Sequence, residues 1–325
     1  MFRTELKPAT PDFQIDLKTK MLSMGSCFAN EMGQKMQEHK FNISTNPGGI
    51  LFNPLSIFRL LKMALNQQPL PGWSFANRQG MQVNYLLHSD MAAKDEQTLH
   101  QSFQQLSTRL NKEATNADLV IFTFGTAFVY EFKENGEIVA NCHKVPQKHF
   151  EKRMLSVEEI MAGFESVKAQ IEALNPNVKF MLTVSPVRHI KEGLPENNVS
   201  KSTLRLACHQ LVEAFDNVDY FPAYELMMDD LRDYRFYEKD LIHPNEQARE
   251  YIWERFGESW FNEATRLFVH DWSKVRSALD HKAFHAESAA HQAFLRSLLN
   301  KLENFSKQVD VAEEVAYVKG QLKPA

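Results

Sequence analysis

The chain has 325 residues, of which 43% are hydrophobic and 24% are charged, and its formal net charge is -4. This is typical of a soluble globular protein with one large domain, or one domain plus an appendage, and the slightly acidic balance argues against a nucleic-acid or anionic-membrane partner. No apolar run approaches the roughly 18–20 residues of a membrane helix, the N-terminus has no apolar signal core, and three cysteines without paired spacing indicate reduced thiols. We therefore expect a cytoplasmic protein.

Strand-like and helix-like segments alternate along residues 20–256, which predicts an α/β fold with three layers, α/β/α, around a mainly parallel sheet. Strands are expected at residues 20–24, 41–44, 118–124, 178–184 and 219–221. Residues 118–124 are nearly all apolar, as expected of a central strand that is covered on both faces. Helices are expected at residues 28–39, 54–66, 95–114, 157–173, 202–215 and 245–256.

Local signals support several of these elements. Asn53 and Pro54 form a helix start with proline in the first turn, and Ser156 with Glu159 forms a capping box. Residues 129–141 contain Asn135-Gly136, a hairpin signal, and residues 73–90 suggest a second short β excursion. Such insertions over a core sheet often shape a substrate pocket.

After about Trp260 the composition shifts to helix formers, so we expect a core domain at residues 1–260 and a helical C-terminal extension at residues 261–325. An apolar stripe in this extension recurs at a 3,4,3,4 spacing over about two heptads. It consists of Leu295, Leu298, Leu302, Phe305 and Val309. We favour a helix that packs on its own domain over a dimer helix, and a homodimer is the alternative.

The segment from Met24 to Ala29, with the sequence Met-Gly-Ser-Cys-Phe-Ala, joins the first predicted strand to the first predicted helix. A side chain at such a turn lies beside unpaired backbone N–H groups and the positive end of a helix dipole. A nucleophile there would be exposed, and an oxyanion beside it would be stabilised. Ser26 and Cys27 supply a hydroxyl and a thiol at this point.

A second candidate segment runs from Asp240 to Pro244. Pro244 suits the first position of a helix, which puts His243 on a loop at the N-terminus of that helix. A carboxylate that orients an imidazole, and an imidazole that deprotonates a nucleophile, form a catalytic triad. The structural alternative is that Asp240 only caps the turn and that His243 packs beneath it.

These motifs resemble the GSCFA family, whose name stands here as Gly25 to Ala29, and that family is grouped with the SGNH (GDSL-type) hydrolases. The resemblance extends from about Phe2 to Phe256. Further matching segments are residues 46–49, 124–126, 141–144, 185–188, 234–237 and 240–244. The resemblance implies the fold and the place of the site, but it defines the substrate less well.

The GDSL-type motif has the order Gly, Asp, Ser, with the nucleophile third. Aligned without a gap, Gly25 matches the glycine, Ser26 matches the aspartate and Cys27 matches the nucleophile. A helix N-terminus and a nearby imidazolium would lower the pKa of Cys27. The alternatives are a shift by one residue, which presents Ser26, and a Cys27 that is a small buried filler.

The resemblance also implies an oxyanion hole built from a glycine N–H and an asparagine side chain. Gly48 or Gly49 matches the glycine. The asparagine is missing, because Ala127 follows Thr126 at the corresponding place. Its replacement could be Thr126, Asn46 or Asn141, and the sequence does not choose among them.

Two further groups are candidates for substrate contacts. His143 and Lys144 follow Asn141-Cys142, and we expect either pocket residues or, more commonly, a plain hairpin; this spacing is not that of a metal site. Arg188 follows a predicted strand at the carboxyl edge of the sheet, where it could hold a carboxylate or phosphate. Its alternative role is an ion pair with Asp229, Asp230 or Asp233.

Together these features predict an SGNH-like enzyme that hydrolyses an acyl ester or thioester, or transfers its acyl group. Cys27 would be the nucleophile, His243 the base and Asp240 the group that orients it. The substrate would be a small-molecule or carbohydrate-linked acyl compound, with no metal and no cofactor. The alternative is a non-catalytic protein that binds a small molecule or carbohydrate on the same scaffold.

Overall fold

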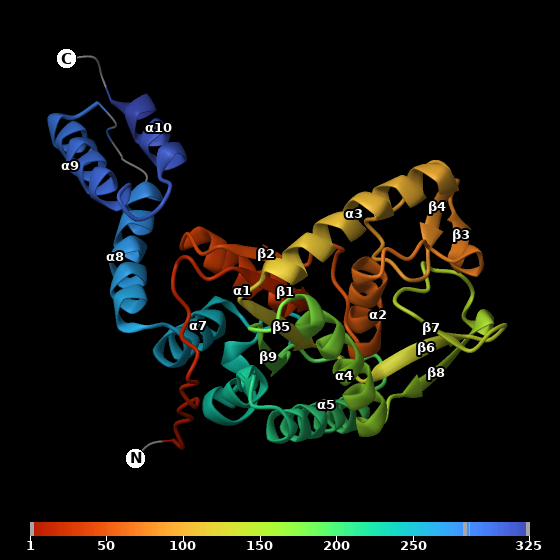
Figure 1. The fold of residues 1–325 in the computed structure, drawn as a ribbon. Helices are drawn as coiled ribbons and strands as arrows, with labels where there is room; N and C mark the ends of the chain where they lie inside the picture. The colour runs from red at the N-terminus through yellow and green to blue at the C-terminus, as the bar shows by residue number, and fades with distance from the viewer. Residues whose placement is uncertain (1–2, 282–284, 286, 323–325) are drawn as a thin grey trace.

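The computed structural model describes residues 3–281, 285 and 287–322. In this part of the chain five short, mostly buried strands form one parallel sheet in the order β10-β9-β5-β1-β2 (Figure 1). Their bounds are β1 Met21–Gly25, β2 Ile43–Thr45, β5 Leu119–Phe124, β9 Lys179–Val184 and β10 Val218–Tyr220. The predicted α/β fold with a parallel sheet is confirmed, and the predicted strands match these within a few residues.

Helices cover both faces of this sheet (Figure 1). One face packs against α1 (Cys27–Glu38) and α7 (Glu246–Trp260), and the other against α2 (Pro54–Leu65), α3 (Glu96–Asn116), α4 (Val157–Leu174) and α5 (Leu194–Ala214). Alternate residues of β5 enter the two cores: Leu119 and Ile121 join the first, and Val120 and Phe122 the second. A strand whose two faces are both buried has to be apolar throughout, which explains the sequence of β5.

Several aromatic rings of the second core meet edge to face. Phe58 of α2 meets Phe122 and Phe124 of β5 at centroid distances of 5.4 and 5.8 Å, and Phe164 of α4 lies 5.6 Å from Phe180 of β9. Each fully buried ring of this kind contributes about 1.5–3 kcal/mol. These contacts fix β5 and β9, and with them the loops that follow the two strands.

The connectivity places a topological switch point at the carboxyl edge between β1 and β5. The chain leaves β1 through α1 on one face to reach β2, and returns through α2 and α3 on the other face to reach β5. Neighbouring strands whose connections leave on opposite faces form a topological switch point, the usual ligand crevice of an open parallel sheet. The loops that begin after Gly25 and after Phe124 both open there.

Two small antiparallel sheets extend from the core, as Figure 1 shows. The first pairs β3 (Phe75–Arg78) with β4 (Met81–Asn84), and the second has the order β7-β6-β8, with β6 Phe128–Phe132, β7 Glu137–Val139 and β8 Phe150–Met154. The hairpin predicted around Asn135-Gly136 is present, although its loop has four residues. Strand β8 was not predicted. Short helical turns η1 (Gly72–Ser74) and η2 (Gln147–His149) precede β3 and β8.

The predicted helix caps of α2 and α4 are confirmed. Asn53 accepts the N–H of Ser56, and Ser156 and Glu159 form both bonds of the capping box. Helix α5 begins at Leu194, eight residues before its predicted start. The missed signal is Gly193, which has φ +89°, followed by Pro195 in the first turn.

The chain ends in three helices that extend away from the sheet (Figure 1): α8 Glu263–Leu279, α9 Ala289–Phe305 and α10 Ala312–Gln321. Leu295, Leu298 and Leu302 of the predicted stripe are buried in one cluster with Trp272 of α8 and Val318 of α10. The stripe therefore packs within its own chain, as we favoured. The division into two domains at residue 260 stays a prediction.

Helix α8 is joined to the C-terminal end of α1 by polar contacts. Trp272 donates its Nε1–H to the carbonyl of Glu38 at 2.8 Å, and His39 Nε2 lies 3.1 Å from Ser273 Oγ. Arg276 pairs with the Glu38 carboxylate. These contacts connect the C-terminal helices to the core.

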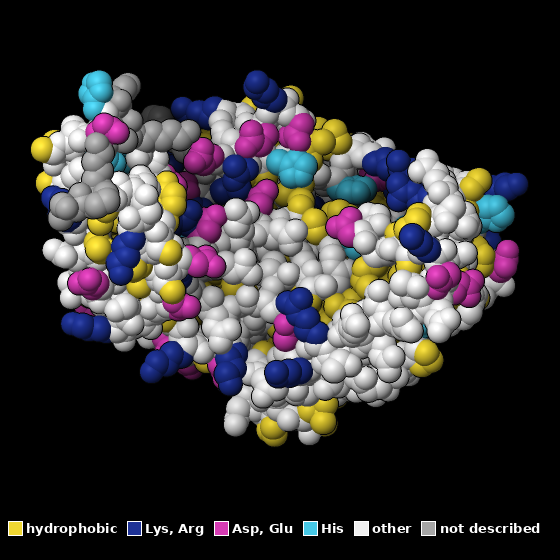
Figure 2. Space-filling model, turned by 90° about the horizontal axis from the view of Figure 1, so that it is seen from above, with side chains coloured by type: hydrophobic (Ala, Val, Ile, Leu, Met, Phe, Trp, Pro, Cys, Tyr) yellow, Lys and Arg dark blue, Asp and Glu magenta, His cyan; other side chains and the backbone are white. Residues whose placement is uncertain are grey.

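The surface carries charges of both signs. On the face seen in Figure 2, Lys and Arg side chains are interspersed with Asp and Glu. None of the helices among the described residues combines the length and the apolar character needed to cross a bilayer. The remaining short elements, α6 Ala223–Glu225, η3 Leu226–Leu231 and η4 Tyr234–Phe236, lie between β10 and the Asp-His segment.

Candidate active site

The turn after β1 needs glycine at its first position. Gly25 has φ +151°, and a Cβ atom there would lie 2.1 Å from the carbonyl oxygen of Thr123 on β5. Its N–H donates to Asn46 Oδ1 at 2.7 Å, and its carbonyl accepts the N–H of Leu51 at 3.1 Å. The first and second βα loops are therefore tied together at the carboxyl edge of the sheet.

Ser26 and Cys27 differ sharply in accessibility. Ser26 is the N-cap of α1 and is 1% exposed; its N–H donates to the Thr123 carbonyl, and its Oγ has no hydrogen-bond partner among the described residues. Cys27, the first residue of α1, is half-buried. Of the two candidate nucleophiles, Cys27 is therefore the more exposed.

The resting state of Cys27 differs from our expectation. Burial raises the pKa of the thiol, and the carboxylate of Glu31 raises it further, because both oppose a negative charge on sulfur. The N–H groups of Phe28 and Cys27 and the charge of Lys201 act in the opposite direction. The expected lowering at a helix N-terminus is thus outweighed, and Cys27 rests as a thiol.

Asp240 organises the loop that carries His243. One carboxylate oxygen, Oδ1, accepts the N–H groups of Ile242 and His243 at 2.9 and 3.0 Å, and Oδ2 lies 2.7 Å from His243 Nδ1. The bond to His243 and these backbone bonds hold the pKa of Asp240 at about 2. With Nδ1 donating to a carboxylate, Nε2 is the nitrogen left to accept a proton.

The same loop is anchored to the carboxyl edge of the sheet beyond β9. The N–H of Arg188 donates to the Ile242 carbonyl at 3.2 Å, and its guanidinium lies over the rings of Tyr237 and Tyr234, with centroids at 4.1 and 5.0 Å. Arg188 also donates to the Leu241 carbonyl at 3.4 Å. It therefore supports the Asp-His loop.

Two details of this region correct the predictions. The suggested ion pair of Arg188 with Asp229, Asp230 or Asp233 does not form among the described residues; Asp230 instead pairs with Arg3 at 3.0 Å. Helix α7 begins at Glu246 with Asn245 as its N-cap, so Pro244 lies outside the helix. The side chain of Asn245 caps the N-terminus of α7, since its Oδ1 accepts the N–H of Ala248.

Glu31 is a site residue that the sequence reading missed. It lies one helical turn after Cys27 on α1, and its Oε2 is buried without a hydrogen-bond partner among the described residues. Burial raises the pKa of its carboxyl group, while Arg249 and His243 lower it. The charge of Glu31 thus acts on Cys27, and the charge of His243 acts on Glu31. The i, i+4 spacing from Cys27 was the available signal.

Lys201 of α5 is the second residue that was missed. Its Nζ donates to the carbonyls of Gly125 and Ser185 at 2.7 Å each, at the ends of β5 and β9. The residue is 1% exposed, and burial lowers its pKa to about 7, whereas a negative charge on Cys27 would raise it. A lysine in a helix normally indicates a solvated surface, so only the tertiary structure reveals this position.

The predicted oxyanion residues are largely committed to structural contacts. Asn46 accepts from Gly25 and donates to Asn30 at 2.7 Å, and Thr126 Oγ1 contacts Ser200 Oγ at 3.1 Å and accepts the Phe128 N–H. Gly49 has φ +85°, and a Cβ there would lie 2.4 Å from His88. Gly48 is buried, and a Cβ there would lie 2.7 Å from Leu60. Gly48 and Gly49 remain candidates through their backbone N–H groups alone.

Asn141 and His143 are tied to the β3–β4 hairpin. The N–H of Asn141 donates to the Tyr85 carbonyl, and His143 Nε2 lies 2.7 Å from the Asn84 carbonyl. His143 is buried, which lowers its pKa, and its φ of +48° places it in a tight loop after β7. Among the described residues no group of three or more His, Cys, Asp or Glu is placed to hold a metal ion.

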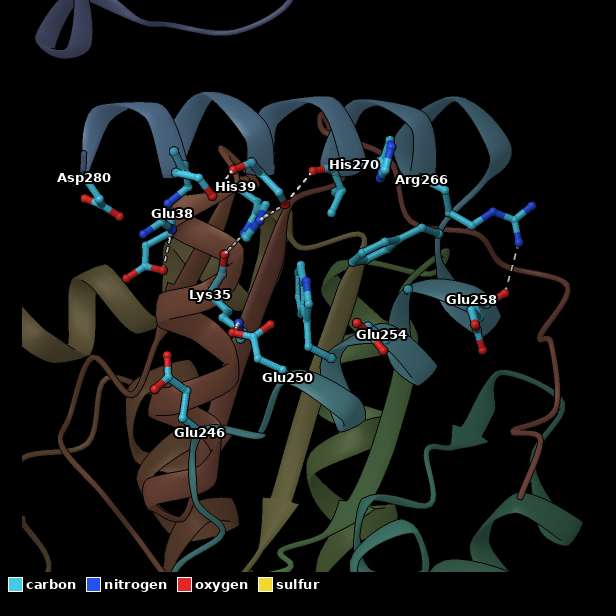
Figure 3. Close-up of a pocket in the computed structure, with 17 residues that line it drawn as sticks. Lys35, Glu38, His39, Glu246, Glu250, Glu254, Glu258, Arg266, His270 and Asp280 are labelled. Atoms are coloured by element: carbon cyan, nitrogen blue, oxygen red, sulfur yellow. Dashed lines mark hydrogen bonds and ion pairs between the residues drawn. The ribbon is translucent and has the colours of Figure 1, made fainter. Parts of the chain in front are cut away.

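A groove of about 780 Å³ opens elsewhere, between α1, α7 and α8 (Figure 3). It is lined by the C-terminal half of α1, including Lys35 and His39, by acidic residues of α7 such as Glu250 and Glu254, and by α8. The strand arrows in Figure 3 point away from it. Because α1 runs antiparallel to β1, this groove lies at the amino edge of the sheet and contains none of the predicted site residues.

A parallel sheet with helices on both faces defines the class of three-layer α/β/α folds. The model of the GSCFA family matches residues 20–256, and that of the GSCFA domain protein C-terminal domain matches residues 272–324. The chain therefore belongs to the GSCFA family.

No curated protein matches the sequence. Similar solved structures include a Streptococcus pneumonia protein whose description names platelet activating factor (10% identity, 75% of this chain and 85% of that one, TM-score 0.39). A second is a carbohydrate esterase family 3 protein from Talaromyces cellulolyticus (11% identity, 79% of this chain and 99% of that one, TM-score 0.35). A third is the acetyl xylan esterase Est2A from Butyrivibrio proteoclasticus (10% identity, 76% of this chain and 66% of that one, TM-score 0.34). Likenesses of this size say nothing about what this chain binds or cleaves.

Proposed function

We propose that the protein is an SGNH-like acyl hydrolase or acyltransferase that acts through Cys27. The observation that carries the proposal is the arrangement at the carboxyl edge of the sheet. Cys27, whose thiol is half-buried, is the first residue of α1 at the switch point, and Arg188 holds the Asp240–His243 pair at the same edge of the sheet. Thiol, imidazole and carboxylate are the components of nucleophilic acyl transfer.

The first half of the reaction would form an acyl-enzyme. His243 Nε2 takes the proton of the Cys27 thiol, and the sulfur attacks the acyl carbonyl to give a tetrahedral oxyanion. The oxyanion collapses as the bond to the leaving group breaks, and the imidazolium returns its proton to the leaving alkoxide or thiolate. Asp240 keeps Nδ1 protonated throughout, which fixes the tautomer and stabilises the imidazolium.

The second half would release the acyl group. His243 takes a proton from water or from an acceptor hydroxyl or amine, and that oxygen or nitrogen attacks the thioester. The Cys27 thiolate leaves and is reprotonated. Because thioesters pass acyl groups readily to alcohols and amines, transfer to an acceptor competes with hydrolysis, and the substrate class is a small or carbohydrate-linked acyl ester or thioester.

A screen of p-nitrophenyl esters and acyl thioesters, with intact-mass detection of the adduct, tests the proposal. We expect an acyl adduct on Cys27 that Cys27→Ala removes together with turnover. Ser26→Ala is the matched control and should retain both, because the Ser26 hydroxyl is buried. An adduct on Ser26, or turnover that survives in Cys27→Ala, would contradict the assignment.

The alternative is a non-catalytic binding protein on the same scaffold. It is favoured by the raised pKa of Cys27 and by the structural hydrogen bonds of Asn46 and Thr126, two of the three side chains that could replace the missing asparagine. Reversible ligand binding that is unchanged in Cys27→Ala, without any adduct, would favour this alternative.

A further inference from the structure

Lys201 is a buried cation without a buried anion to match it. Its side chain projects from α5 to the ends of β5 and β9, and the residue is 1% exposed. Among the described residues it forms no ion pair with a carboxylate. Burial of an unpaired ammonium is costly, and two hydrogen bonds to neutral carbonyls do not neutralise its charge.

Its two hydrogen bonds lead directly to the nucleophile turn. Nζ donates to the carbonyl of Gly125, and a Cβ atom on Gly125 would lie only 3.3 Å from Cβ of Ser26. Through its other bond, to Ser185, Lys201 also fixes the end of the neighbouring strand. The residue therefore lies beneath the ends of β5 and β9, next to the turn that carries Cys27.

The charged groups around Cys27 are few. Glu31 on α1 disfavours a negative charge on the sulfur, and Lys201 on α5 favours it. Around Lys201 itself lie the Tyr224 ring, at 5.8 Å from Nζ, and His189, whose protonation Lys201 disfavours. Cys27 is the acidic group that interacts with the Lys201 charge.

We propose that Lys201 is a positioning residue that stabilises negative charge at Cys27, first on the thiolate and then on the tetrahedral oxyanion. In GDSL-type enzymes an asparagine side chain stabilises the oxyanion, and Ala127, at the corresponding place here, has no donor. Lys201 would stabilise the oxyanion instead, from beneath the turn. Lys201 acts by its charge, which it carries below its pKa of about 7, and by holding the Gly125 peptide. The oxyanion part of this inference rests on the proposed function, and the thiolate part does not.

The test measures the rate at which iodoacetamide modifies Cys27 as a function of pH, by peptide mass mapping, in wild type and in Lys201→Met. Below pH 7, where Lys201 is charged, we expect the profile of the variant to be shifted to higher pH by about one unit, so that the rate there falls about tenfold. At higher pH, where Lys201 is neutral in the wild type, the two profiles should converge. Lys168→Met is the matched control. It removes another buried ammonium, one that pairs with Glu172 on α4, and should leave the profile unchanged.

An unchanged profile in a folded Lys201→Met protein overturns the inference. Lys201→Gln keeps a hydrogen-bond donor but no charge, so it separates the effect of the charge from that of the hydrogen bonds. If the charge alone matters, both variants should show the same shift. Because no turnover enters these measurements, an inactive protein with the expected shift would retain the thiolate role of Lys201. An active protein without the shift would reject only Lys201.

A measurement on the wild-type chain covers the case in which neither variant folds. Iodoacetate and iodoacetamide leave adducts of similar size on Cys27, one negative and one neutral. If Lys201 stabilises negative charge there, the carboxymethyl protein should melt at a higher temperature than the carbamidomethyl protein at pH 7. An equal or lower melting temperature for the charged adduct counts against the inference.

Discussion

Cys27 and Glu31 lie one turn apart on α1, and the carboxylate of Glu31 raises the pKa of the Cys27 thiol. The same carboxylate responds to the charge of His243. Glu31 therefore acts against thiolate formation in the resting protein and would favour a protonated His243 once the proton has moved. This relationship leads to the first prediction.

Replacement of Glu31 by Gln should lower the pKa of Cys27, because it removes the like charge that opposes the thiolate. We expect faster alkylation of Cys27 below pH 9, by a few-fold, measured by peptide mass mapping. Glu254→Gln is the control, since it removes the same charge from α7 in the groove at the opposite edge of the sheet. Slower alkylation in Glu31→Gln would show that the carboxylate has a different role.

His243→Ala should abolish turnover while leaving the melting temperature nearly unchanged. General base catalysis is worth roughly 10²–10⁴ in rate, whereas the His243 side chain is 39% exposed and contributes little to packing. Activity on the substrate found in the ester screen and thermal unfolding are the two measurements, with His270→Ala as a surface control. A large loss of stability with retained specific activity would make His243 a packing residue.

The three cysteines should react with iodoacetamide in the order Cys27, Cys142, Cys208. Burial raises the pKa of all three thiols, that of Cys142 to about 11 and that of the fully buried Cys208 still further. A raised thiol pKa means that the thiolate fraction keeps growing above pH 9. The alkylation rate of Cys27 should therefore still be rising at pH 9, with no plateau at lower pH. A plateau near neutral pH would indicate a resting thiolate.

Stability should depend on pH through Lys201. Its native pKa of about 7 lies below its ordinary value of 10.5, so between these values the unfolded chain binds a proton that the native chain does not. Stability contributed by neutral Lys201 is therefore gained as pH rises from 7 to 10.5 and lost as it falls, by a few kcal/mol at most. Urea unfolding from pH 7 to 10 should show this slope in wild type and a flatter one in Lys201→Met; an equal slope in both would contradict it.

The double substitution Leu298→Glu and Leu302→Glu should cause misfolding and aggregation. Both side chains are buried among α8, α9 and α10, where each contributes about 1.5–3 kcal/mol and where a carboxylate would have no partner. Circular dichroism and light scattering give the outcome, with Leu267→Glu, at a position that is 62% exposed, as the control. A soluble, folded monomer from a dimeric parent would show instead that the stripe forms a homodimer.

The sequence predicted the secondary structure where local signals are strong. The apolar run of β5, the cap at Asn53 and the capping box at Ser156 each depend on residues within one element, and each is present in the structure. Strand β8 was not predicted because residues 150–154 are mostly polar. The start of α5 was not predicted because the helix begins after a glycine with positive φ and has a proline in its first turn, a signal that was not recognised.

By itself, the sequence determined the parallel α/β fold, the turn that presents Cys27 and the local pairing of Asp240 with His243, because each is encoded by periodicity or by residues close in the chain. Only the tertiary structure decided which side chains are buried around that turn. Burial made Ser26 inaccessible, raised the pKa of Cys27 and committed Asn46 and Thr126 to structural bonds. The tertiary structure also placed Lys201 and Glu31 where their charges act on the thiol. Desolvation and charge at a site depend on every element packed around it, and no local sequence pattern carries that information.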